Sequence, residues 1–128
     1  VKAVKSNDIV KVDVNFEYSK DLFLDYIYKL KSDVSNILDS MEDNVYLFGA
    51  HVFSQTLLNF GLDESKVISI LDNDVKKRGR RLYGTNLFTE SPEILKDVDH
   101  PIVILRSGLY NSEVEDQLRL INPTVKII

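Results

Sequence analysis

The feature that most constrains this chain is a regular alternation of short apolar runs and helix-like segments from residue 44 onward. The apolar runs are unbroken and rich in Val, Ile and Leu, as are strands that helices cover on both faces. Strand candidates lie within residues 44–50, 66–74, 86–89, 100–108 and 123–128, and helix candidates within residues 51–62, 91–98 and 111–122. Strands separated by helices need crossover connections, so the alternation predicts a mainly parallel sheet.

Residues 44–128 are therefore expected to form an α/β fold, a small Rossmann-like three-layer domain with a mainly parallel sheet. Residues 19–42 place apolar side chains at three- and four-residue steps, which predicts an amphipathic helix with Ser19 as its N-cap. We expect this added N-terminal helix to join the Rossmann-like domain, so that one domain covers residues 19–128. Residues 1–18 alternate apolar and polar side chains in places, which favours an N-terminal arm or edge strand.

Composition excludes several classes of function. The 128 residues are 44% apolar, as expected for one globular domain, and their net charge of −4 argues against nucleic-acid binding. No apolar run approaches the roughly 18 residues that a membrane span requires. The absence of cysteine and the presence of only two histidines make a metal site improbable. We therefore expect a cytoplasmic protein that binds neither nucleic acid nor a membrane.

The first predicted strand-to-helix turn reads FGAHVFS, residues 48–54. A dinucleotide-binding turn has glycine at three places, and here those places hold Gly49, His51 and Ser54. The turn can form, but His51 has a side chain where a pyrophosphate would approach the backbone. The expected inner face of the following helix is Val52, Phe53, Thr56, Leu57 and Phe60. A free-standing NAD-binding Rossmann enzyme is thus an alternative that this turn does not favour.

The second predicted strand ends in Asp72, which lies 23 positions after Gly49. An acidic residue at this place often binds ribose hydroxyls in Rossmann folds. The other possibility is that Asp72 and Asp74 pair with the basic segment that follows.

That basic segment is the sharpest local signal in the sequence. It comprises Lys76, Lys77, Arg78, Arg80 and Arg81 in an otherwise acidic chain. Arginine forks and lysine ammonium groups suit phosphate oxygens. Gly79 and Gly84 permit positive φ, so the segment can follow a tight, defined path. The pattern is consistent with an anion site and with a solvated turn.

No catalytic set is visible in the sequence. No serine lies in a G-x-S-x-G turn, and we find no grouping of acid, base and nucleophile. Open α/β sheets place their ligands at the carboxyl ends of the strands. Residues 49–51, 72–73 and 107–110 are expected to line that edge, with Lys77, Arg78 and Arg80 steering phosphates to it.

From Gly49 onward the chain resembles the C-terminal domain of the sugar C-methyltransferases, bacterial enzymes that act on nucleotide-linked deoxysugars. The matching residues are Gly49, Ala50, Leu57, Leu58 and Asn59; Asp72, Lys77, Gly79, Arg80, Leu82, Gly84 and Thr85; and Glu113, Gln117 and Leu118. The chain departs from the family pattern at Phe53, Val75 and Tyr83, and residues 106–108 replace a proline-tryptophan-asparagine run. The likeness covers about two-thirds of the chain and is most specific over residues 72–85.

The resemblance implies a non-catalytic accessory domain that holds a nucleotide-sugar, whereas S-adenosylmethionine binds a preceding catalytic domain. The small N-terminal domains of sugar acetyltransferases share part of this pattern and also bind nucleotide-sugars. The expected substrate-binding residues are Gly49, Ala50, His51, Asp72, Asn73, Lys77, Gly79, Gly84, Thr85, Ser107 and Tyr110, with no catalytic, cofactor or metal residues. The remaining alternative is a structural or interaction domain in which the helix over residues 19–42 docks on an upstream domain or a partner chain.

Overall fold

The computed structural model describes residues 2–106 and 108–128, and the side chains of residues 16–106 and 108–128. The chain divides into two compact units, Val1–Asp33 and Val34–Ile128. The first unit consists of the early part of one long helix, and the second holds the sheet and the other helices.

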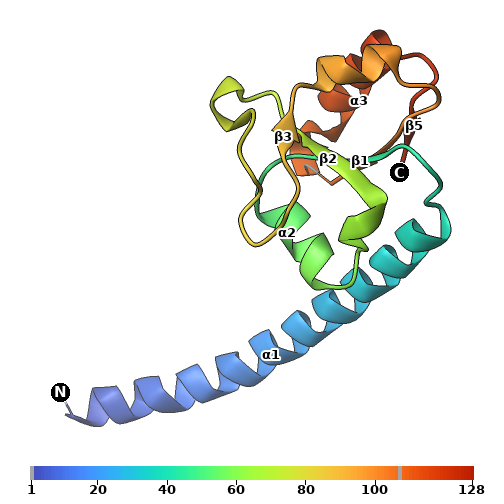
Figure 1. Cartoon of the computed structure of the whole chain (residues 1–128). Helices are drawn as coiled ribbons and strands as arrows, with labels where there is room; N and C mark the ends of the chain where they lie inside the picture. The colour runs from blue at the N-terminus through green and yellow to red at the C-terminus, as the bar shows by residue number, and fades with distance from the viewer. Residues whose placement is uncertain (1, 107) are drawn as a thin grey trace. The chain divides into compact units, whose positions relative to one another are not determined.

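Helix α1 extends over Lys2–Asp39, drawn from blue to cyan in Figure 1. The predicted arm or edge strand over residues 1–18 is therefore wrong for residues 2–18, which are helical. Ser19, the expected N-cap, lies inside the helix rather than at its start. The physical reason is that no glycine or proline occurs before Gly49, so nothing in the backbone interrupts the helix.

The sheet of the second unit has five strands: β1 (Val45–Phe48), β2 (Val67–Leu71), β3 (Thr89–Glu90), β4 (Ile102–Leu105) and β5 (Lys126–Ile127). Their spatial order is β3-β2-β1-β4-β5, and every pairing is parallel. Phe48 at the end of β1 is in register with Leu71 of β2 and Leu105 of β4. The parallel sheet and the Rossmann-like fold are confirmed.

Besides the end of α1, the second unit holds helices α2 (Val52–Asn59) and α3 (Asn111–Ile121). Its described residues also form the short 3₁₀ helices η1 (Glu64–Lys66), η2 (Val75–Lys77), η3 (Pro92–Asp97) and η4 (Gly108–Tyr110). Helix α2 lies on one side of the sheet, and η3 and α3 lie on the other (Figure 1). The helix predicted over residues 91–98 is thus a 3₁₀ helix.

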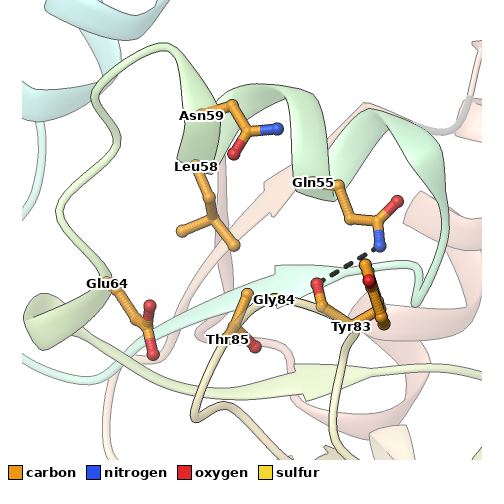
Figure 2. Close-up of a pocket in the computed structure, with 7 residues that line it drawn as sticks. All are labelled: Gln55, Leu58, Asn59, Glu64, Tyr83, Gly84 and Thr85. Carbon is orange, nitrogen blue, oxygen red and sulfur yellow. Dashed lines mark hydrogen bonds between the residues drawn. The ribbon is translucent and has the colours of Figure 1, made fainter.

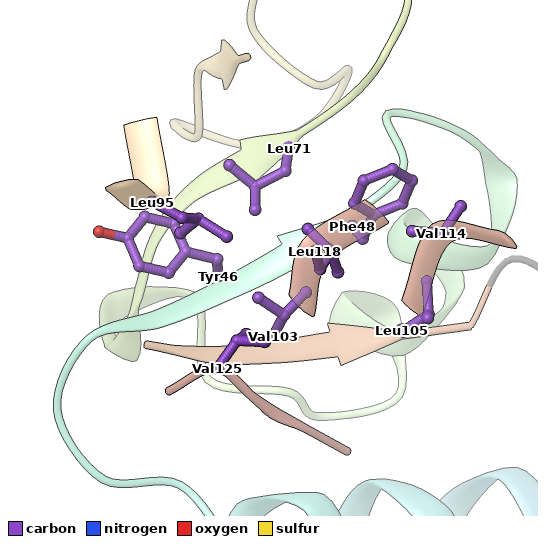
Figure 3. Close-up of a cluster of buried hydrophobic side chains, with 9 residues drawn as sticks. All are labelled: Tyr46, Phe48, Leu71, Leu95, Val103, Leu105, Val114, Leu118 and Val125. Carbon is purple, nitrogen blue, oxygen red and sulfur yellow. The ribbon is translucent and has the colours of Figure 1, made fainter. Parts of the chain in front are cut away.

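Alternating side chains of the strands build a core on each face of the sheet. Tyr46 and Phe48 pack with Leu95 of η3 and with Val114 and Leu118 of α3 (Figure 3). The intervening residues of β1, including the fully buried Leu47, point to the opposite face.

The expected inner face of α2 is wrong at Val52 and Phe53, which are 63% and 47% exposed. Ser54 and Leu57, three residues apart, are buried instead. Because α2 has only eight residues, little more than two turns, this pair takes up most of the contact with the sheet. Val52 and Phe53 are therefore left at the surface, next to the carboxyl ends of the strands.

Within the part of the chain that the structure describes, no helix combines the length and the apolar character needed to cross a membrane.

Candidate functional site

The candidate site lies where the order of the strands reverses. From β1 the chain passes to β2 on one side of the sheet and later to β4 on the other, which leaves a crevice outside the carboxyl ends of the strands. A depression of about 380 Å³ lies at this place. It is lined by Phe48, Gly49, His51, Val52, Phe53, Asp72, Asn73, Lys77, Tyr110 and Val114. We call it the first depression.

Asp72 ties together the elements around this depression. Its carboxylate accepts hydrogen bonds from the backbone N–H groups of Ala50 and Asp74, each at 2.8 Å, and from the Lys77 ammonium at 3.0 Å. Burial opposes ionisation, but these three donors outweigh it and hold the pKa of Asp72 below its ordinary value. Of the two possibilities for Asp72, the pairing with the basic segment is present, through Lys77.

His51 covers the backbone of the first turn. Its ring lies so close to Gly49 that a β-carbon added there would be 2.1 Å from Nε2, so only glycine fits beneath the ring. Within the described residues the buried Nδ1 atom has no hydrogen-bond partner. Burial and the nearby Lys77 ammonium lower the pKa of His51 and outweigh the opposing effect of the Asp72 carboxylate. The neutral imidazole is therefore favoured.

Ser54 also occupies a place where a dinucleotide-binding turn has glycine. Its buried hydroxyl donates a hydrogen bond to the Gly49 carbonyl. The His51 ring stands edge-on to Phe53, with ring centroids 5.6 Å apart. The turn is therefore filled by its own side chains where a pyrophosphate would otherwise meet the backbone.

Asn73 connects the end of β2 to α3. Its side-chain amide and that of Gln117 exchange two hydrogen bonds, both of 2.8 Å. Asn73 lines the first depression, but its polar atoms are engaged by this pair. A ligand that bonded to the Asn73 amide would have to compete with Gln117.

The basic segment borders a second depression of about 260 Å³, which shares His51 and Lys77 with the first. Its lining residues are Ala50, His51, Gln55, Lys77, Arg80, Arg81, Leu82, Tyr83 and Thr89. The Arg81 guanidinium lies 5.8 Å from the centre of the Phe88 ring. By contrast, the structure shows no partner for the Arg80 guanidinium among the described residues. Three basic residues, Lys77, Arg80 and Arg81, therefore line the second depression.

The glycines of the basic segment have a structural explanation. Gly79 and Gly84 adopt φ of +73° and +78°, which confirms the expected positive φ. The Thr85 hydroxyl donates to the Leu82 carbonyl at 2.8 Å and accepts from the Leu87 N–H at 3.1 Å, which closes a turn. The spacing of glycine, glycine and threonine thus sets the path of the backbone.

A third depression, of about 380 Å³, lies beside this turn and is shown in Figure 2. Its lining residues are Gln55, Leu58, Asn59, Glu64, Tyr83, Gly84 and Thr85. It shares Gln55 and Tyr83 with the second depression, and the Gln55 amide donates to the Tyr83 carbonyl at 3.3 Å. Leu58, Asn59, Gly84 and Thr85, which carry part of the family resemblance, meet here. We call the three depressions together the sheet-edge groove.

The structure brings most of the predicted site residues to this groove. The first and second depressions collect Gly49, Ala50, His51, Asp72, Asn73, Lys77 and Tyr110, and the third collects Gly84 and Thr85. Gly79 lines none of the three, and Ser107 lies outside the described residues. Sequence reasoning missed Gln55 as a site residue, and likewise Phe53, Asn59 and Glu64. The helical spacing from His51 to Gln55 could have found the first, because residues four apart share one face of a helix.

The described residues contain no group of three or more His, Cys, Asp or Glu side chains that could hold a metal ion. Comparison of the chain with known protein families, curated proteins and solved structures finds no match.

Proposed function

We propose that this domain binds a nucleotide-sugar in the sheet-edge groove. It would act as the accessory substrate-binding domain of a sugar methyltransferase-like protein and would not be catalytic alone. The likeness over residues 72–85 to the C-terminal domain of sugar C-methyltransferases supports this assignment. In such a protein S-adenosylmethionine would be held by a neighbouring catalytic domain.

The observation that carries the proposal is the position of Lys77 and Arg80. Lys77 borders both the first and second depressions, and Arg80 borders the second. A diphosphate presents several anionic oxygens, which an arginine fork and an ammonium group can bind together. The first depression lies at the reversal of strand order, where sheets of this kind take their ligands.

The character of the lining residues changes along the groove in the order of the parts of a nucleotide-sugar. The first depression offers aromatic side chains, among them Phe53 and Tyr110, which suit a flat base. The second is cationic and suits the diphosphate. The third has polar side chains, including Asn59 and Glu64, which suit sugar hydroxyls. We therefore assign the base, the diphosphate and the sugar to the three depressions in this order.

The alternative of an NAD-binding enzyme has less support. The ring of His51 and the hydroxyl of Ser54 fill the turn over Gly49, which a dinucleotide would need open. The other alternative, a domain that is only structural, is the outcome expected if no nucleotide-sugar binds.

The test is a thermal-shift and titration series with a dTDP-deoxysugar, dTDP, NAD and S-adenosylmethionine. A ligand that binds only the folded chain raises its melting temperature. We expect the dTDP-deoxysugar to raise it most, dTDP less, and the other two not at all. Failure of the dTDP-deoxysugar to shift it would contradict the proposal.

The matched variants are Arg80→Ala and Arg78→Ala. Both residues belong to the basic segment, but Arg78 lines none of the three depressions. Loss of a charged hydrogen-bond donor should weaken binding about tenfold or more in Arg80→Ala, with Arg78→Ala close to wild type. Equal losses in both variants would indicate only a general attraction of the segment for anions.

A further inference from the structure

Besides the sheet-edge groove, the molecule has an exposed apolar surface on α1, in the first unit. Phe16, Phe23, Leu24 and Tyr26 are 63%, 61%, 42% and 50% exposed. Every side chain from residue 16 to residue 26 is exposed. Large apolar groups gathered on one segment usually mark a contact with another molecule or domain.

The apolar residues of α1 follow a heptad pattern. Phe16, Phe23, Leu30 and Ile37 are seven apart, and Ile27 and Val34 lie four residues after Phe23 and Leu30. These are the d and a positions of a coiled-coil seam. Val34 and Ile37 are 3% exposed within the second unit. The seam is therefore covered at its C-terminal end and uncovered from Phe16 to Phe23.

The charged residues of the seam favour one arrangement of two such helices. Lys20 occupies an a position. In a parallel pair, Lys20 would face Lys20 of the second copy inside the seam, and like charges there are unfavourable. In an antiparallel pair, a positions face d positions instead. In the register that sets Lys20 opposite Leu30 of the second copy, the aliphatic stem of Lys20 can pack on that leucine.

The flanking positions agree with the antiparallel arrangement. Antiparallel helices bring e positions together on one flank and g positions together on the other. The e positions are Glu17, Leu24 and Lys31. With Lys20 opposite Leu30, Glu17 faces Lys31 of the second copy, and Leu24 faces Leu24. On the other flank Tyr26 faces Tyr26, so no like charges meet.

We propose that residues 16–31 of α1 form an antiparallel two-helix interface with the same residues of a second copy of this chain. The interface covers Phe23, which packs on Ile27 of the second copy, and places two Glu17–Lys31 pairs at its ends. It spans only about two heptads, so the association is concentration-dependent. It does not depend on nucleotide-sugar binding.

The first experiment is sedimentation equilibrium over a range of concentrations. We expect the wild-type chain to dimerise and Phe23→Glu to raise the dimer dissociation constant at least tenfold. Tyr18→Glu is the matched control, because Tyr18 is 69% exposed but lies at an f position, away from the seam. A chain that stays monomeric throughout, or a Phe23→Glu variant as dimeric as wild type, would overturn the proposal. Circular dichroism verifies that each variant keeps its helix content.

The second experiment tests the orientation of the helices. Glu17→Lys and Lys31→Glu should each weaken the dimer, and the double variant should restore it, because both pairs are then reversed. The chain contains no cysteine, so Leu24→Cys adds a single thiol. Oxidation should link two copies through this thiol, since antiparallel helices bring the two Leu24 positions together. Absence of both the restoration and the crosslink would exclude the antiparallel arrangement.

Discussion

The basic segment, taken with its flanking residues from 71 to 90, and the apolar stretch over residues 16–33 of α1 are opposites in composition and in structure. The basic segment is charged, yet Asp72, Gly79 and Thr85 hold it through hydrogen bonds, and Leu82 and Leu87 anchor it with 5% and 6% exposure. The apolar stretch contains several large hydrophobic side chains, yet every side chain from residue 16 to residue 26 is exposed.

The contrast shows that the number of polar or apolar residues does not determine how firmly a segment is held. Two buried leucines and a set of backbone hydrogen bonds are sufficient to fix a charged segment. An apolar helix gains little from its hydrophobic side chains unless another surface covers them. The following predictions test this contrast.

The largest difference in stability is expected between the alanine variants of two leucines. Leu71 is fully buried in the core, and Leu24 on α1 is 42% exposed. Leu71→Ala should lower the free energy of unfolding of the second unit by about 2–5 kcal/mol, because it removes buried surface and leaves a cavity. Leu24→Ala should change it by less than about 0.5 kcal/mol. Urea denaturation followed by circular dichroism measures both, at a concentration where the chain is monomeric. Comparable losses would show that Leu24 is packed in the folded state.

A smaller effect is expected at Asp72. Asp72→Asn removes the charge that pairs with Lys77 and weakens the link between the first turn and the basic segment, at a cost of about 1–3 kcal/mol. Asp74→Asn is the matched control, because Asp74 is exposed and caps the Lys76 N–H, which asparagine can also do. Urea denaturation at neutral pH should separate the two variants, and equal stabilities would contradict the role assigned to Asp72.

The substitution at Asp72 also predicts a pH dependence. The pKa of Asp72 is lower in the folded chain than its ordinary value, so its stabilising effect is present above that ordinary value and is lost as pH falls through the folded pKa. Wild type should therefore lose more stability on acidification than Asp72→Asn does. Parallel pH profiles of the two chains would contradict the lowered pKa.

The fold could be predicted because buried parallel strands are visible as unbroken apolar runs, such as residues 45–48 and 102–105. The N-terminal segment could not, because the short alternation of apolar residues over 9–16 fits a strand as well as part of a helix. Only the absence of glycine and proline before Gly49 indicated that a helix could continue through it.

The edge of the sheet that holds the candidate site followed from the predicted topology. Asp72 followed from its place at the end of the second predicted strand, and Lys77 from the run of basic residues. The pairing of Asn73 with Gln117 joins residues 44 apart in the sequence, so no local pattern indicates it. The position of the His51 ring over Gly49 depends on a side-chain conformation, which the sequence does not specify. Phe53 was assigned to the wrong face because α2 is too short for its apolar periodicity to be decisive.

The smallest effects on stability are expected from one alanine substitution in each segment, and these two effects should have opposite signs. Gly79 has φ of +73° and open space where a β-carbon would lie, so Gly79→Ala meets no clash and carries only the backbone cost, about 1 kcal/mol. Ser19 lies exposed inside α1, where alanine has the higher helix propensity, so Ser19→Ala should stabilise the helix by about 0.5 kcal/mol.

Thermal unfolding followed by circular dichroism at the helix band measures both changes. The melting temperature should fall in Gly79→Ala, and the helix signal of α1 should rise or persist to higher temperature in Ser19→Ala. A Gly79→Ala variant as stable as wild type would mean that the basic segment adapts its backbone freely, and the contrast with α1 would then be lost. A loss of helix signal in Ser19→Ala would instead show that Ser19 makes a contact on α1 that alanine cannot replace.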